Sequence, residues 1–139
     1  MAESVQHKEL VRCIVSYMET ITNCCHDFIE ADLIGFNTRT TRVVGGYYPD
    51  VFYKDHEKII IGEAKTDADL LNRHTDSQLS SYIQEVLLFP GEKHIIISVP
   101  FISCNTLYNY VNRKMEKHPK YGIYFHLIND SQQNDILWL

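Results

Sequence analysis

Two short strings near the middle of the chain combine two carboxylates with one amine: Pro49-Asp50 and Glu63-Ala64-Lys65. Carboxylate oxygens are the ligands that Mg²⁺ prefers in proteins. A lysine beside them is a compact cationic donor that can stabilise negative charge on a reacting group. If the three side chains converge, they form a divalent-metal site with a cationic neighbour.

The segments on either side of the two strings predict a β-hairpin over residues 47–54 and 59–65, with the polar linker 55–58 as its loop. In a symmetric register Asp50 lies opposite Glu63. Directly opposed Cβ atoms are about 4.5–5.5 Å apart, and like charges there are destabilising unless a cation separates them. Alternation along the strand places Lys65 on the face of Glu63 and turns Ala64 away.

A surface ion pair is the alternative interpretation of these residues. Glu63 and Lys65 could pair in solvent with Asp50 beside them, a contact worth at most about 1 kcal/mol. The apolar runs Ile59–Ile61 and Ile95–Ile97 favour a buried hairpin instead. Unpaired carboxylates are costly in such a place, so we expect a functional site.

The elements around the hairpin follow from apolar periodicity and predict the order α-β-β-β-α-β-α-β. We therefore expect an α/β fold, with a mixed central sheet that contains the antiparallel hairpin and is flanked by helices. Thr75-Asp76-Ser77-Gln78 matches a capping box, and Pro49 predicts a bulge or strand start because proline donates no ladder hydrogen bond. The other expected elements are a helix capped by Ser4 and carrying Leu10 to Ile21, an extended segment at 29–36, a helix at 77–89, a strand at 94–100, a helix at 103–117 and a strand at 121–128.

With these residues and this order, the chain resembles the PD-(D/E)XK nuclease superfamily, which has the restriction-endonuclease-like fold. The resemblance rests on Pro49-Asp50, on Glu63-Ala64-Lys65, on the apolar stretch before Glu63 and on the element order. It implies that residues 1–139 form a single nuclease-like domain. It also implies a metal-dependent endonuclease that hydrolyses DNA phosphodiester bonds.

The resemblance further implies a ligand set. Asp50, Glu63 and the Ala64 backbone carbonyl would hold Mg²⁺, with Mn²⁺ as a substitute, and Lys65 would orient the attacking water. Hydrolysis would leave a 5′-phosphate and a 3′-hydroxyl.

Two further site residues are suggested by the same family. A helix before the sheet often supplies another acidic residue, for which Glu9 is the better candidate and Glu3 the weaker one. A glutamine on the helix after the lysine could be Gln78. Solvation of a helix surface explains either glutamate equally simply, and Gln78 could be only the last residue of the capping box.

Two other functions remain open. The same fold could serve as a nucleic-acid-binding or assembly subunit without cleavage, although no residue of the triad is missing. An α/β protein unrelated to nucleic acid could use Asp50 and Glu63 for a structural cation, but such a site gains nothing from Lys65. For the enzyme, we expect duplex or branched DNA as substrate. A homodimer would be needed to cut both strands, because one small domain holds one site.

Composition limits these options. The chain has 139 residues and a net charge of −5, which argues against electrostatic coating of nucleic acid but leaves room for a local basic surface. Its four cysteines are scattered and lack zinc-ligand spacing. It contains no apolar run of membrane-spanning length and no signal-peptide pattern at its start. We therefore expect a cytoplasmic protein with no membrane association.

Overall fold

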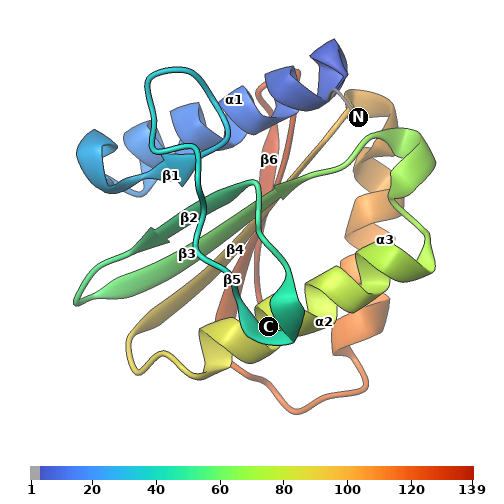
Figure 1. Ribbon diagram of the computed structural model, residues 1–139. Helices are drawn as coiled ribbons and strands as arrows, with labels where there is room; N and C mark the ends of the chain where they lie inside the picture. The colour runs from blue at the N-terminus through green and yellow to red at the C-terminus, as the bar shows by residue number, and fades with distance from the viewer. Residues whose placement is uncertain (1–3) are drawn as a thin grey trace.

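In the computed structural model, which describes residues 4–139, a six-stranded sheet carries helices on both faces (Figure 1). The strands lie in chain order across the sheet. The β3–β4 and β4–β5 pairs are parallel, and the other three pairs are antiparallel. The bounds are α1 Val5–Ile21, β1 Glu30–Ala31, β2 Val51–Lys54, β3 Lys58–Ala64, α2 Arg73–Leu87, β4 Glu92–Val99, α3 Cys104–Met115, β5 Ile123–Asn129 and β6 Asn134–Trp138.

The two faces of the sheet have separate hydrophobic cores. Alternation along β3 turns Ile60 toward α1, and Ile59 and Ile61 toward α2 and α3. Figure 1 shows α1 along one face, with α2 and α3 together on the other. At Gly62 the helix α1 comes very close, because an added Cβ would lie 2.8 Å from the Ile14 side chain. This close contact holds the middle of α1 against β3 near the end of that strand.

The predicted hairpin and its register are confirmed. Val51 pairs with Gly62 and Lys54 with Ile59, which is the symmetric register expected from the sequence. The Asp55 carboxylate closes the loop, accepting hydrogen bonds from the N–H groups of Glu57 (2.7 Å) and Lys58 (2.9 Å). The register therefore brings the residue before Val51 to the end of β3.

The α/β class with a mixed sheet is also confirmed, while several element bounds differ from expectation. The extended segment expected at 29–36 contains only the two-residue strand β1. Strand β6 was not predicted, because its residues are mostly exposed and begin with polar Asn134 and Asp135. The strand expected at 47–54 begins only at Val51, so Pro49 lies two residues before β2 and outside the strand.

Of the two predicted helix caps, the one of α1 is confirmed and the one of α2 is wrong. The Ser4 hydroxyl accepts a hydrogen bond from the His7 N–H at 3.0 Å, so it caps α1 as expected. The capping box at Thr75 is wrong, because α2 begins earlier. Its cap is Asn72, whose side chain accepts from the Thr75 N–H at 2.8 Å.

Within residues 4–139, none of the helices has both the length and the apolar character needed to cross a bilayer.

Candidate active site

Asp50 and Glu63 lie against each other where β2 begins and β3 ends. The Asp50 N–H donates to Glu63 Oε2 at 3.1 Å, and the Ala64 N–H donates to Asp50 Oδ2 at 2.9 Å. Their side chains are only 15% and 9% exposed. The hairpin register thus produces a buried pair of carboxylates, as the sequence predicted.

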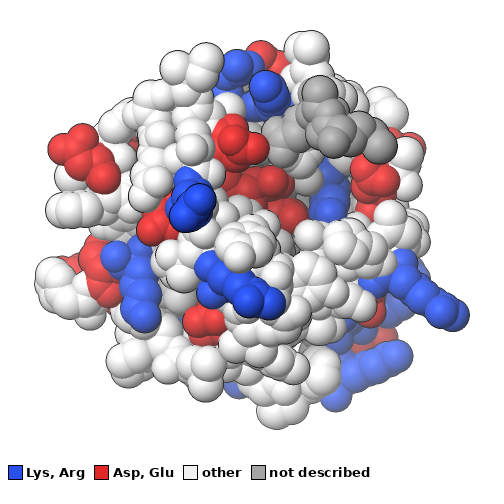
Figure 2. All heavy atoms as spheres, viewed as in Figure 1, with Lys and Arg blue, Asp and Glu red and all other residues white. Residues whose placement is uncertain are grey.

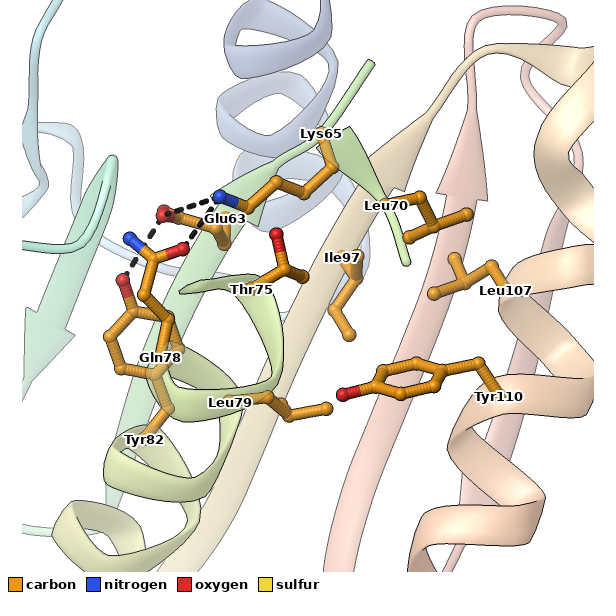
Figure 3. Close-up of a pocket in the computed structure, with 10 residues that line it drawn as sticks. All are labelled: Glu63, Lys65, Leu70, Thr75, Gln78, Leu79, Tyr82, Ile97, Leu107 and Tyr110. Carbon is orange, nitrogen blue, oxygen red and sulfur yellow. Dashed lines mark hydrogen bonds and ion pairs between the residues drawn. The ribbon is translucent and has the colours of Figure 1, made fainter. Parts of the chain in front are cut away.

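Lys65 and two residues of α2 complete the group around Glu63 (Figure 3). Lys65 Nζ lies 4.0 Å from Glu63 Oε1 and donates to Gln78 Oε1 at 2.6 Å. Tyr82 donates its hydroxyl to Glu63 Oε1 at 3.1 Å. Gln78 and Tyr82 are four residues apart on α2, so they share one helix face. The amine expected on the face of Glu63 is therefore present there, and Gln78 contacts that amine.

Burial dominates the electrostatics of Glu63. It raises the pKa of Glu63 well above its usual value, and the nearby Asp50 charge raises it further, while Lys65 partly offsets both effects. Burial also raises the pKa of Tyr82, and the Glu63 charge adds to this effect. Burial and the Asp50 charge thus both work against the charged form of Glu63.

Asp50 behaves in the opposite way. Burial works against its charged form, but hydrogen bonds with His7, Glu63 and the Ala64 N–H hold the pKa of Asp50 below its usual value. The surroundings thus favour the charged form of Asp50 and disfavour the charged form of Glu63. A bound cation would favour full ionisation of both groups.

The α1 residue that reaches this site is His7, and the structure does not bring Glu9 to it. His7 Nε2 lies 3.3 Å from Asp50 Oδ1. Glu9, two residues further along the helix, points to another side, where it pairs with Arg12 and is 60% exposed. Two residues turn an α-helix by more than half a revolution, so His7 and Glu9 cannot face the same site. Glu3, the weaker candidate, lies outside the described residues.

His7 and Tyr82 are the site residues that sequence reasoning missed. Tyr82 fits the apolar stripe of α2, the ordinary pattern of a core residue, although it follows Gln78 by one turn. His7 lies in the first turns of a helix that was expected to supply only an acidic residue. One available signal was the spacing between Tyr82 and the candidate Gln78.

The segment leading into Asp50 is held against α2. Its short turn η2 (Val44–Gly46) donates the Val44 N–H to Glu85 Oε1 at 2.9 Å. Gly45 has a φ of 83°, and a Cβ there would lie 2.4 Å from Ser81 Oγ, so only glycine allows this approach. The chain between β1 and Asp50 is thereby fixed to the helix that carries Gln78 and Tyr82.

The donor chemistry fits a hard divalent cation. Across residues 4–139 no three His, Cys, Asp or Glu residues form a group able to hold a metal ion. The ligands that the family resemblance implies are the Asp50 and Glu63 carboxylates, which lie together here, and the Ala64 carbonyl. Such a set suits Mg²⁺, which commonly takes one or two carboxylates and keeps several waters. Figure 2 shows acidic atoms at the floor of a hollow in this face, with lysine and arginine atoms around it.

Comparison with known proteins gives no match for this chain among family models, curated protein sequences or solved structures.

Proposed function

We propose that the protein is a metal-dependent nuclease that hydrolyses DNA phosphodiester bonds. The observation that carries this proposal is the buried Asp50–Glu63 pair with the Lys65 amine 4.0 Å from Glu63 Oε1. A buried pair of carboxylates with one raised pKa is short of positive charge. Clusters of perturbed titratable groups of this kind are characteristic of functional sites.

Asp50, Glu63 and the Ala64 carbonyl would hold the Mg²⁺. When bound, the metal polarises the scissile phosphoryl oxygen and lowers the pKa of a bound water. Tyr82 would support the metal site, because its hydroxyl donates to Glu63 and restricts the orientation of that carboxylate.

Lys65 is the proposed cationic group of the reaction. Its ammonium would stabilise the negative charge that develops on the phosphate in the transition state. Gln78 accepts one Lys65 N–H at 2.6 Å, which restricts the position of the amine before substrate arrives. Preorganisation of this kind avoids reorientation during the reaction.

The fold we propose for this function is that of the PD-(D/E)XK superfamily. The support is the sequence resemblance together with the position of its two strings on one antiparallel hairpin, at the edge where β3 and β4 end. Helix α2 follows β3 and carries the glutamine that contacts Lys65.

A non-cleaving DNA-binding subunit is the second candidate. One observation favours it: Asp50 already accepts the Ala64 N–H and lies beside His7 Nε2, so its carboxylate has partners without a metal.

The two functions are separated by incubating the purified protein with linear, nicked, branched and single-stranded DNA in Mg²⁺, Mn²⁺ or EDTA. A nuclease converts at least one substrate to products that carry 5′-phosphates, and only when metal is present. A binding subunit retards the DNA in all three conditions and leaves it intact, a result that would remove the nuclease proposal.

A further inference from the structure

A groove of about 550 Å³ lies at the same edge of the sheet as the candidate active site. Because β3, β4 and β5 are parallel, the residues that follow them emerge side by side at this edge. The groove lies between the short turn η4 (Phe101–Ser103), the start of α3 and the turn between β5 and β6. Leu107 of α3 lines both this groove and the cavity of Glu63 and Lys65 (Figure 3). The two sites are therefore adjacent.

The lining of the groove combines apolar surface with side-chain amides. Phe101 is 52% exposed, and three exposed residues with amide side chains, Asn105, Gln133 and Asn134, line the same groove. Its lining contains no lysine or arginine, and its one charged residue is Asp135. A phosphate would lack a cationic partner in this groove. A flat, uncharged ring with hydrogen-bonding edges would find both apolar and amide partners, because amides donate and accept.

The apolar side of the groove is held firmly in place. The Phe101 N–H donates to Asp130 Oδ1 at 3.0 Å, and Ser103 Oγ donates to Asp67 Oδ1 at 2.7 Å. Asp67 follows Lys65 by two residues, so this contact ties η4 to the segment that carries the proposed cationic group. Because these contacts hold the backbone that carries the exposed Phe101 ring, little ordering of this backbone is needed when a ligand binds.

We propose that this groove binds an unpaired nucleobase of the DNA strand whose backbone lies at Asp50, Glu63 and Lys65. The base would stack on Phe101 and present its edges to Asn105, Gln133 and Asn134. This inference rests on the proposed nuclease function and specifies its substrate: DNA with single-stranded or unpaired character next to the cleaved bond. A base inside a duplex does not expose the face that such stacking requires.

The test measures binding in EDTA, so that neither metal nor cleavage contributes. The probes are a short single strand containing 2-aminopurine and the same strand in a blunt duplex. We expect wild type to bind the single strand more tightly than the duplex and to change the 2-aminopurine fluorescence. Phe101→Ala should weaken single-strand binding by about fivefold or more. Phe101→Tyr should restore binding, and Leu88→Ala, which removes a 72% exposed side chain at the end of α2, should leave it unchanged.

The outcomes separate this inference from the proposed function. The groove proposal fails if single strand and duplex bind equally tightly, or if a folded Phe101→Ala binds the single strand as tightly as wild type does. If Phe101→Ala does not fold, Asn105→Ala takes its place, with the same expected loss and the same contradicting result. If Phe101→Ala cleaves DNA at the wild-type rate and only with metal, the groove proposal also fails, while the nuclease proposal stands. If the single strand binds as expected but is not cleaved in Mg²⁺ or Mn²⁺, the groove proposal stands and the nuclease proposal fails. If no DNA binds, and wild type self-associates while Phe101→Ala does not, the surface is a protein contact and the inference fails.

Discussion

Asp50 and Glu63 are connected twice at the end of the hairpin: the Asp50 N–H donates to Glu63 Oε2, and the Asp50 carboxylate accepts the N–H of the residue after Glu63. The backbone of each strand thus binds the carboxylate from the other. This arrangement fixes two acidic side chains close together in a buried place, and the raised pKa of Glu63 is its electrostatic consequence.

The first prediction concerns the charge of Glu63 without and with metal. Glu63→Gln keeps an oxygen for the Tyr82 hydroxyl and removes a carboxyl whose charged form is disfavoured by burial and by Asp50, so at neutral pH the apoprotein should be as stable as wild type or more stable. In Mn²⁺ the order should reverse, because a ligand at a hundredfold excess over Kd stabilises by about 2.7 kcal/mol. Melting curves in EDTA and in Mn²⁺ measure both effects. A wild type that gains nothing from Mn²⁺ would contradict the metal assignment.

Tyr82 provides a prediction about stability. Tyr82→Phe removes the donor to Glu63 Oε1 and leaves a buried carboxylate oxygen short of one hydrogen bond. Such a loss costs about 1–3 kcal/mol in the free energy of unfolding, which urea denaturation at neutral pH measures. Tyr48→Phe is the matched control, because Tyr48 is 60% exposed. Equal effects of the two substitutions would show that the Tyr82 hydroxyl does not support Glu63.

Gln78 allows the positioning of Lys65 to be tested. Gln78→Ala removes the acceptor 2.6 Å from Lys65 Nζ, and the freed amine should slow cleavage by about tenfold to a hundredfold. DNA binding should change little, since Gln78 is buried. Gln84→Ala, on an exposed part of the same helix, is the control. A normal cleavage rate in Gln78→Ala would limit Gln78 to a structural role.

A pH prediction follows from a buried histidine pair on the α1 face of the sheet. His126 Nε2 lies 2.8 Å from His94 Nδ1, and His126 Nδ1 lies 2.6 Å from the Tyr17 hydroxyl. Burial, together with the smaller effect of the neighbouring His94, lowers the pKa of His126 to about 4. Between pH 4 and the ordinary histidine value of about 6.5, the unfolded chain binds more protons than the native one. Stability should therefore fall as the pH drops through this window, by up to about 3 kcal/mol.

Urea denaturation at pH 7 and pH 4.5 measures that loss. His126→Gln should reduce the difference between the two pH values, while His56→Gln, at an 88% exposed position, should not. An unchanged acid sensitivity in His126→Gln would assign the effect to other groups.

The hairpin and its carboxylate pair could be predicted because they depend on period-two alternation and a short polar loop. The run Ile59–Ile61 indicated a strand buried on both faces, and the register then followed from the loop. The rotation of α1 about its own axis, which decides the side chains that face the sheet, could not be predicted in this way. Whether His7 or Glu9 faces the site depends on how the helix lies on the sheet, including its close approach at Gly62.

Other features depended on contacts that local patterns do not record. Tyr82 fits the apolar stripe of α2, and only the folded chain shows its hydroxyl directed at Glu63. Strand β6 has no clear apolar alternation, and its pairing with β5 defines it. Helix α2 is capped by Asn72 and not by the predicted capping box at Thr75, because the helix begins about one turn earlier in the chain.

The proposed function is tested most directly by the rate of DNA cleavage in saturating Mg²⁺, for wild type and for Lys65→Ala. Lys65 supplies the cationic group of the site and is not a proposed metal ligand, so its removal leaves both carboxylates in place. We predict that wild type cuts DNA in Mg²⁺ and not in EDTA, and that folded Lys65→Ala binds the DNA but cuts it more than about 100-fold more slowly. Cleavage by Lys65→Ala at the wild-type rate, or cleavage by wild type that persists in EDTA, would contradict the mechanism.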